Sequence, residues 1–165
     1  MTPTIREVGR EAREALLPLM EGLQAVERAM EANRVPPSGI GPHLDRQLDL
    51  MERDGGFALL AEAEGRPVGF LIGLVVEDAD LYVLPENRRL GAVTDLYVAE
   101  AARRQGLAAR LMAEAEARFV ALGLPRMSIG ALAGNAAARA LYLRWAGREH
   151  AVIYEKPIGA ETTGL

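Results

Sequence analysis

Residues 95–109 combine side chains and a glycine in a pattern that could bind a phosphate group. A strand-like apolar run ends at Val98, two arginines follow at Arg103 and Arg104, and a helical pattern begins around Gly106. The first N–H groups of a helix have no intrahelical partners and lie at the positive end of its dipole, so they can hold an anion. Gly106 and Ala108 would let a ligand approach the backbone. The same residues also fit an ordinary helix start with two solvated arginines.

A second group of polar residues lies on one face of the helix predicted over residues 135–145. Asn135, Arg139 and Tyr142 stand at positions i, i+4 and i+7. In the simplest interpretation, Asn135 caps the helix and Tyr142 is a half-buried aromatic with a solvated hydroxyl. A capping asparagine can nevertheless also contact a ligand.

The elements that position these residues follow from hydrophobic periodicity and from glycine and proline breaks. The pattern predicts strands over residues 4–8, 57–62, 66–76, 88–98, 126–131 and 148–156, and helices over 10–30, 42–53, 105–122 and 135–145. This order indicates an α/β fold with a mixed central β-sheet flanked by helices. We expect a single domain over residues 1–158 and a frayed tail over 159–165. The long connection 77–87 is either decoration or a wall of the substrate site.

Composition excludes several classes of protein and site. The chain has 165 residues, of which 50% are hydrophobic and 25% charged, as in an ordinary globular protein. It has no cysteine and two histidines, so disulfides and thiolate chemistry are excluded and no metal site is expected. No signal peptide or membrane span is evident, which makes the cytoplasm the expected compartment.

Charge is distributed unevenly along the chain. The net charge is −4, which gives no footprint for nucleic acid or an anionic membrane, so neither is an expected partner. Residues 1–82 carry 8 basic and 15 acidic side chains, whereas residues 83–165 carry 11 and 8. The acidic half could attract a cation and the basic half an anion, although uneven surface charge explains the counts equally well.

The two motifs together resemble those of the GNAT superfamily, the acetyl-CoA-dependent N-acetyltransferases. The family's Q/R-x-x-G-x-G/A motif matches residues 103–108, and its N-x-x-A-x-x-L-Y motif with a following glycine matches Asn135, Ala138, Leu141, Tyr142 and Gly147. The predicted order of elements is also the family's order. The resemblance covers residues 88–156 well, while residues 1–87 fit the topology without specific motifs.

The resemblance implies roles for individual residues. Acetyl-CoA would be the acetyl donor, and Val98 would offer an N–H to the thioester carbonyl. Asn135 would bind the pantetheine arm, and Tyr142 would protonate the departing thiolate as general acid. An ordinary phenol and a thiol have pKa values close enough for that transfer. The implied cofactor-binding residues are Leu96, Tyr97, Val98, Arg103, Arg104, Gln105, Gly106, Leu107, Ala108, Ala109 and Asn135.

The general base is where the sequence departs from the family pattern. Several members carry a Glu or His on the strand before the pyrophosphate loop, but Ala92, Thr94 and Leu96, which share the Val98 face, are not bases. Asp95 has the opposite parity and would reach a cleft on that face only if a bulge redirected it. Asp95 is therefore either catalytic or a structural, capping or interface carboxylate. A water chain, or Glu77, Asp78 or Asp80 in the long connection, could replace it as base.

Two functions of different classes remain open from the sequence. The first is an N-acetyltransferase in which a primary amine, preferably of a small cationic molecule, attacks acetyl-CoA directly in a ternary complex. The second is a non-catalytic acyl-CoA-binding or regulatory domain, and a protein N-terminal or lysine acetyltransferase is a variant of the first. The charge distribution of the chain does not indicate which amine is the acceptor. The resemblance also implies a possible homodimer through sheet edges or the C-terminal strands. In the sequence itself only the apolar run 151–154 favours it, and core burial would explain that run equally well.

Overall fold

The strands form one mixed sheet in the computed structural model, which describes residues 2–79, 83–146 and 148–158. In these ranges the sheet has five strands in the order β1-β2-β3-β4-β5. The first three pairings are antiparallel and β4 pairs with β5 in parallel. The strands are β1 (Thr4–Val8), β2 (Gly56–Ala63), β3 (Arg66–Glu77), β4 (Arg89–Val98) and β5 (Met127–Ile129). The mixed α/β class predicted from the sequence is confirmed.

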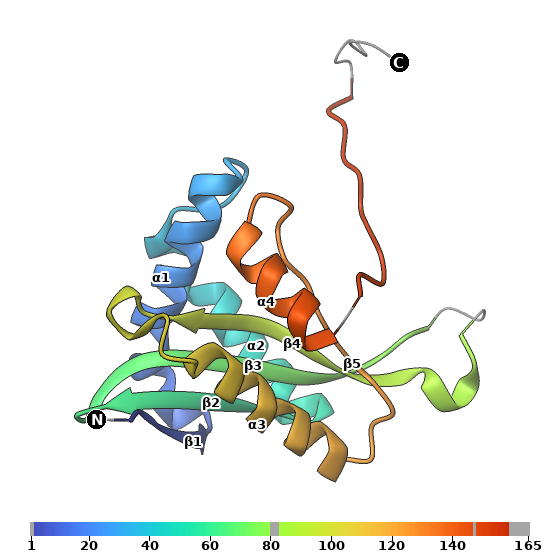
Figure 1. The fold of residues 1–165 in the computed structure, drawn as a ribbon, viewed down its shortest axis with the longest axis horizontal. Helices are drawn as coiled ribbons and strands as arrows, with labels where there is room; N and C mark the ends of the chain where they lie inside the picture. The colour runs from blue at the N-terminus through green and yellow to red at the C-terminus, as the bar shows by residue number, and fades with distance from the viewer. Residues whose placement is uncertain (1, 80–82, 147, 159–165) are drawn as a thin grey trace.

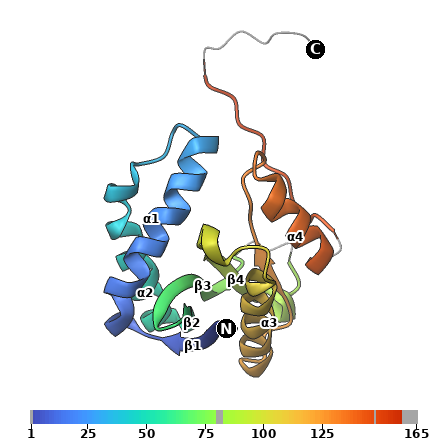
Figure 2. The same cartoon turned by 60° about the vertical axis from the view of Figure 1, so that its left-hand side comes forward.

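The helices cover both faces of the sheet (Figures 1 and 2). They are α1 (Arg13–Met30), α2 (Gly41–Asp54), α3 (Leu107–Ala121) and α4 (Ala136–Ala146). The buried stripes of α1 and α2 pack with Phe70 and Ile72 on one face, and α3 packs with Leu71 and Val93 on the other. A fully buried side chain of this size contributes about 1.5–3 kcal/mol, so these two apolar layers hold the helices on the sheet. Trp145 connects α4 to α3, because its indole N–H donates to Glu116 at 3.3 Å.

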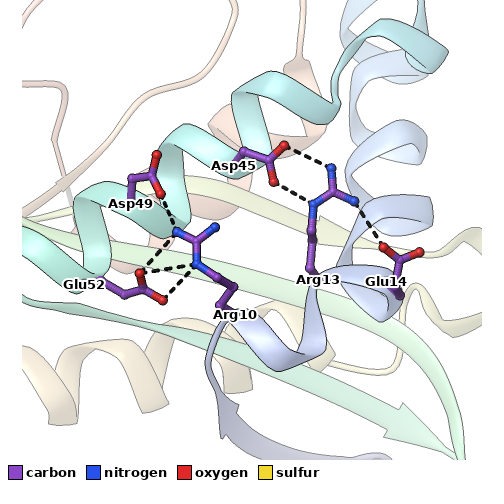
Figure 3. A network of polar contacts seen from close by, with 6 residues as sticks. All are labelled: Arg10, Arg13, Glu14, Asp45, Asp49 and Glu52. Carbon is purple, nitrogen blue, oxygen red and sulfur yellow. Dashed lines mark hydrogen bonds and ion pairs between the residues drawn. The ribbon is translucent and has the colours of Figure 1, made fainter.

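Ion pairs fix the start of α1 against α2 (Figure 3). Both ends of the Arg13 guanidinium fork bond Asp45 on α2, with distances of 2.6 and 3.0 Å. Arg10 pairs with Glu52 at 3.1 Å and also with Asp49. Because these pairs are exposed to solvent, each of them adds little to the stability of the fold. Together they favour one placement of α2 along α1, which matters for the site described below.

The predicted element bounds agree with the structure to within a few residues except at the C-terminus. The hairpin between β2 and β3 turns at Glu64 and Gly65, whose φ values of 53° and 74° are those of the tight turn preferred by twisted strands. The long connection after β3 is only partly described, and Asp80 lies outside the described residues. No helix in the described ranges is long and apolar enough to cross a membrane.

The predicted strand over residues 148–156 is wrong. Residues 148–158 form no ladder with the sheet and are exposed, with Ile153 at 87% and Tyr154 at 90% exposure. The run extends away from the body of the molecule (Figure 1). Its alternation satisfies a strand pattern, but a strand forms only where a neighbour accepts its backbone hydrogen bonds, and β5 spans just three residues. Gly147 of the second motif and the predicted tail 159–165 lie outside the described residues.

Candidate active site

A bulge in β4 lies immediately before Asp95. Asp95 pairs with Ile72 of β3, whereas Val93 pairs with the next residue, Gly73, so Thr94 is an extra residue without a partner in this register. Bulges of this kind often re-aim side chains next to active sites. The bulge that the sequence analysis required is therefore present. Its expected effect is different, however, because Asp95 still lies on the face opposite Val98.

Asp95 points toward α1 and α2, and this is the face on which the cavity lies. Tyr97 packs against the α1–α2 core on the same side, while Val98 and Leu96 pack against the α3 core. The premise that a base must share the Val98 face is therefore wrong. Side chains on the opposite face, directed at α1 and α2, are the ones that reach the cavity.

Asp95 is buried and bonded to a histidine that is distant in sequence. Its carboxylate is 6% exposed, and Oδ1 lies 3.0 Å from Nε2 of His43 on α2. Because an ionised carboxylate only accepts hydrogen bonds, Nε2 of His43 carries the proton in this pair. The side-chain nitrogen of Gln47, one helical turn further along α2, lies 3.4 Å from the same ring nitrogen; with the proton on Nε2 both atoms are donors, so this is a contact and not a second hydrogen bond. The hydrogen bond that His43 donates to Asp95 is the main cause of a raised His43 pKa, and burial opposes it.

A cavity of about 350 Å³ opens beside this pair. It is lined by α1, α2, the bulged part of β4 and residues 130–132 after β5. The parallel pairing of β4 and β5 ends at Val93 and Ile129, where β5 itself ends, and residues 130–132 line the cavity together with Thr94 and Asp95. Oδ2 of Asp95 is buried and has no hydrogen-bond partner in the described part of the chain. Such an orphaned acceptor beside an open volume is where a ligand or water donor would bind.

A second carboxylate faces the cavity from α1. Glu27 pairs with Arg34 at 2.6 Å, and both residues line the cavity with Asp95 and His43. Burial raises the pKa of Glu27, and the neighbouring charge of Asp95 adds to the effect. Two carboxylates on one wall give this volume a preference for cations, which Arg34 offsets in part.

The second sequence motif borders the same region. A smaller hollow of about 80 Å³ is lined by Asn135 and Tyr142 and shares Glu27, Thr94 and Asp95 with the larger cavity. Oδ1 of Asn135 accepts the N–H of Ala138 at 3.1 Å, so the predicted N-cap is present. Burial raises the pKa of Tyr142 to about 12, which makes its hydroxyl a weaker acid than an ordinary phenol. The Tyr142 hydroxyl is therefore less closely matched in acidity to a thiol than the sequence suggests.

The start of α3 has the features of an anion site. Gly106 precedes the helix with φ 74°, Arg104 has φ 60°, and no described side chain caps this end. A side chain added at Gly106 would meet no atom within 4 Å. The first-turn N–H groups of Leu107, Ala108 and Ala109 thus belong to an uncapped helix end facing open space. The Leu107 side chain itself is buried in the α3 core.

Arg103 does not stand free for a phosphate as the sequence analysis assumed. Its Nε donates to the carbonyl of Val98 at 2.9 Å, and its guanidinium lies 5.6 Å from the centre of the Tyr97 ring. Arg103 therefore braces the end of β4 by way of Val98 and Tyr97. Arg104 is exposed, and Gln105 donates from its side chain to the carbonyl of Ala101 at 3.3 Å. Both arginines are exposed, and Arg104 is the one whose side chain has no hydrogen bond in the described residues.

The sequence analysis missed the contribution of α1 and α2. His43 and Glu27 lie 52 and 68 positions from Asp95, and only the packing of the helices on the sheet brings the three together. One signal was available in α2. His43 and Gln47 stand four residues apart beside the buried stripe of Leu44 and Leu48, where a polar side chain must meet the sheet or a cavity. In the described ranges no cluster of residues could hold a metal ion.

The family follows from the chain as a whole. The sequence pattern of the acetyltransferase (GNAT) family matches residues 23–147, which is more than half of the chain and runs from the C-terminal part of α1 through α2, β4 and α3. The chain belongs to the GNAT family. The matched range contains Asp95, the start of α3 and Asn135. No curated protein sequence matches the chain.

Solved structures share this GNAT fold. A GCN5-related N-acetyltransferase from Ralstonia eutropha JMP134 is 24% identical, with a TM-score of 0.73 over 96% of this chain and 99% of that one. The aminoglycoside N-acetyltransferase AAC(6')-Iy, solved with CoA, is 16% identical, with a TM-score of 0.70 over 94% and 95%. A ribosomal-protein-alanine N-acetyltransferase from Brucella melitensis biovar Abortus 2308 is 20% identical, with a TM-score of 0.70 over 94% and 99%. At these identities the likeness concerns the fold alone.

Proposed function

We propose that this chain is an acetyl-CoA-dependent N-acetyltransferase that acetylates a primary amine on a small cationic molecule. The observation that carries the proposal is the cavity where the pairing of β4 with β5 ends after Val93, which two carboxylates line. The amine and the acetyl donor would meet there in one ternary complex, so that much of the rate comes from positioning.

The residues around α3 fit acetyl-CoA. The uncapped helix start and the open space at Gly106 suit its diphosphate, with Arg104 as a nearby positive charge. The Val98 N–H and the Asn135 side chain remain the proposed contacts to the thioester carbonyl and the pantetheine arm. Acetyl-CoA supplies an activated acyl group with a thiolate leaving group. Tyr142 would donate its hydroxyl hydrogen to the departing sulfur, because its pKa of about 12 keeps it protonated across the physiological range.

The acceptor pocket supports a cationic amine of modest size. Its volume of about 350 Å³ lies at the lower end of the range for small-molecule sites. Glu27 and Asp95 both face it, and a carboxylate beside the amine favours binding of the ammonium form. Aminoglycoside acetyltransferases among the structural neighbours act on molecules rich in such amines. The same neighbours include an enzyme named for a protein substrate, so a protein amine is the competing acceptor to be tested.

The observation that favoured a purely acyl-CoA-binding role no longer holds. That reading rested on the lack of a base on the Val98 face, whereas Asp95 and His43 line the cavity on the other face. We therefore retain it only as an outcome of the experiment below.

The decisive experiment measures coenzyme A release with a panel of amines. The panel contains polyamines, aminoglycosides, amino acids and N-terminal peptides, and products are identified by mass spectrometry. The proposal predicts acetylation of at least one small polycationic amine and little or no acetylation of peptides. Tight acetyl-CoA binding without turnover on any amine would instead support a binding domain, and selective acetylation of peptides would replace the acceptor class.

A further inference from the structure

The pair formed by His43 and Asp95 has a geometry that the proposed function does not by itself require. His43 comes from α2 and Asp95 from β4, and their side chains meet through Nε2 and Oδ1 at 3.0 Å. Both residues line the larger cavity. Asp95 is 6% exposed, whereas the His43 side chain is 39% exposed. The histidine therefore stands between a buried carboxylate and the open volume.

The hydrogen bond settles which ring nitrogen can act as a base. Nε2 carries the proton that Asp95 accepts, and Nδ1 makes no hydrogen bond within the described residues. In neutral imidazole the nitrogen without hydrogen is a proton acceptor. An orienting carboxylate of this kind fixes both the tautomer and the ring position.

We propose that His43 is the general base of the acetyl transfer and that Asp95 is the residue that orients it. The inference rests on the proposed function and names its proton acceptor. The assignment differs from the expectation that a residue of β4 itself removes the proton. Here β4 supplies the positioning residue, and the catalytic residue comes from α2.

The chemical reason for preferring His43 lies in its basicity and position. A base works best when its pKa is near the working pH, and an ordinary histidine at about 6.5 meets that condition better than an ordinary aspartate at about 3.9. In addition, the Asp95 carboxylate is largely covered and has one oxygen already bonded to His43. Its other oxygen lacks a partner in the described residues and can receive an N–H of the bound amine.

The proposed step balances as follows. The bound ammonium first gives one proton to water through the open side of the cavity. The lone pair freed on nitrogen then forms the new bond to the acetyl carbon while a second N–H proton passes to Nδ1 of His43. The carbon–sulfur bond then breaks, and the sulfur leaves as a thiol with the proton of the Tyr142 hydroxyl. His43 returns its proton to water through the open side of the cavity, and the Tyr142 phenolate recovers one from water. No oxidant, reductant or metal takes part in this scheme.

The charged groups around His43 determine whether its pKa lies above or below the ordinary histidine value. Asp95 on β4 and Glu27 on α1 raise its pKa, while Arg46 on α2 and burial lower it, and the net pKa lies above the ordinary value. Arg34, which lines the same cavity, is paired with Glu27. Because the unprotonated ring is the active form, kcat/KM should rise with pH through the His43 pKa, above about 6.5.

The first test needs no substrate. The chain has only two histidines, and His150 is exposed in the segment after α4. Long-range ¹H–¹⁵N spectra therefore contain signals from two imidazole rings. A His150→Asn variant shows which of these signals belong to His43. We expect His43 to show the Nε2–H tautomer and to titrate above the ordinary histidine value of about 6.5. In Asp95→Asn, whose side chain keeps its size and loses the charge, the His43 pKa should fall. A His43 ring with Nδ1 protonated, or a pKa unmoved by Asp95→Asn, would overturn the orienting role.

The second test uses an amine that the wild-type chain acetylates. His43→Ala should lower kcat by about 10² to 10⁴, abolish the acidic limb of the kcat/KM profile, and regain activity on addition of imidazole. Asp95→Asn should shift that limb to lower pH, and His150→Asn should leave the profile unchanged. Wild-type turnover by His43→Ala, with the acidic limb retained, would refute the base role while the acetyltransferase function stands. Failure of the wild-type chain to acetylate any amine would refute both.

Discussion

Gly106→Val tests the anion site at the start of α3 against a matched control at the other end of the same helix. Gly106 has φ 74° before the helix, and Gly123 has φ 71° after it. A Cβ added at either glycine meets no atom within 4 Å, so both positions open toward free space. The two substitutions impose the same backbone strain at opposite ends of the helix dipole.

The strain predicts equal and modest losses of stability. An L-residue in the left-handed region costs about 1–2 kcal/mol, and in a protein of this size each kcal/mol lowers Tm by about 2–4 °C. Both variants should therefore unfold about 2–8 °C below the wild type in thermal scans. Their folds should be intact at 25 °C, because stability of about 5–15 kcal/mol is ordinary for such a domain.

The ligand affinity should separate the two variants. A charged hydrogen bond contributes about 1.5–3 kcal/mol, so a valine that keeps the diphosphate from even one first-turn N–H should weaken binding about tenfold to hundredfold. Calorimetry with acetyl-CoA should show this loss for Gly106→Val and wild-type affinity for Gly123→Val. Equal affinities in the two variants would refute the assignment of the diphosphate to this helix end.

Three further predictions concern the acid, the packing of α3 and the C-terminal segment. Tyr142→Phe should lower kcat by about 10² to 10⁴ with little change in acetyl-CoA affinity, and wild-type turnover would remove the acid role. Because burial raises the pKa of Tyr142 to about 12, ionisation of its hydroxyl should cause no loss of kcat up to pH 9. Gly91→Ala brings a Cβ within 2.5 Å of the Phe119 ring and should cost about 1–3 kcal/mol in urea unfolding, whereas Gly39→Ala makes only ordinary contacts and serves as its control. If the exposed run 151–154 mediates the expected dimer, light scattering should give a dimer mass for the full chain and a monomer mass after deletion of residues 148–165, and a monomer at all concentrations would contradict it.

Local sequence pattern was sufficient to predict most of the helices and strands. It was also sufficient to predict the Asn135 cap in the second motif. The stripe of Leu44, Leu48 and Met51 predicts α2 because burial of one helical face depends on spacing within the helix itself. Asn135 is recognisable as a cap for the same reason, since its acceptor and the Ala138 N–H are three residues apart. Helix starts, tight turns and apolar stripes are short-range features, so a single sequence carries them.

The C-terminal strand shows where local pattern is insufficient. Alternation over residues 148–156 satisfies one face of a strand, but pairing needs a neighbouring backbone, and that neighbour is fixed by the whole sheet. In the structure β5 is short and the run stays exposed. A strand is a property of two segments, whereas the sequence pattern describes one.

Some features of the candidate site can be predicted from the sequence, whereas others depend on the tertiary structure. The sequence alone determined the family resemblance, the glycine at the start of α3, and Asp95 and Tyr142 as the residues to examine. Asp95 lies on the face opposite Val98, as parity along the strand predicts, but only the tertiary structure shows that the cavity lies on that face. The partnership of Asp95 with His43 depends on how α2 packs across 52 positions of chain. Side-chain parity can be counted along one strand, but the cavity belongs to several elements, and only their packing brings a histidine to the carboxylate.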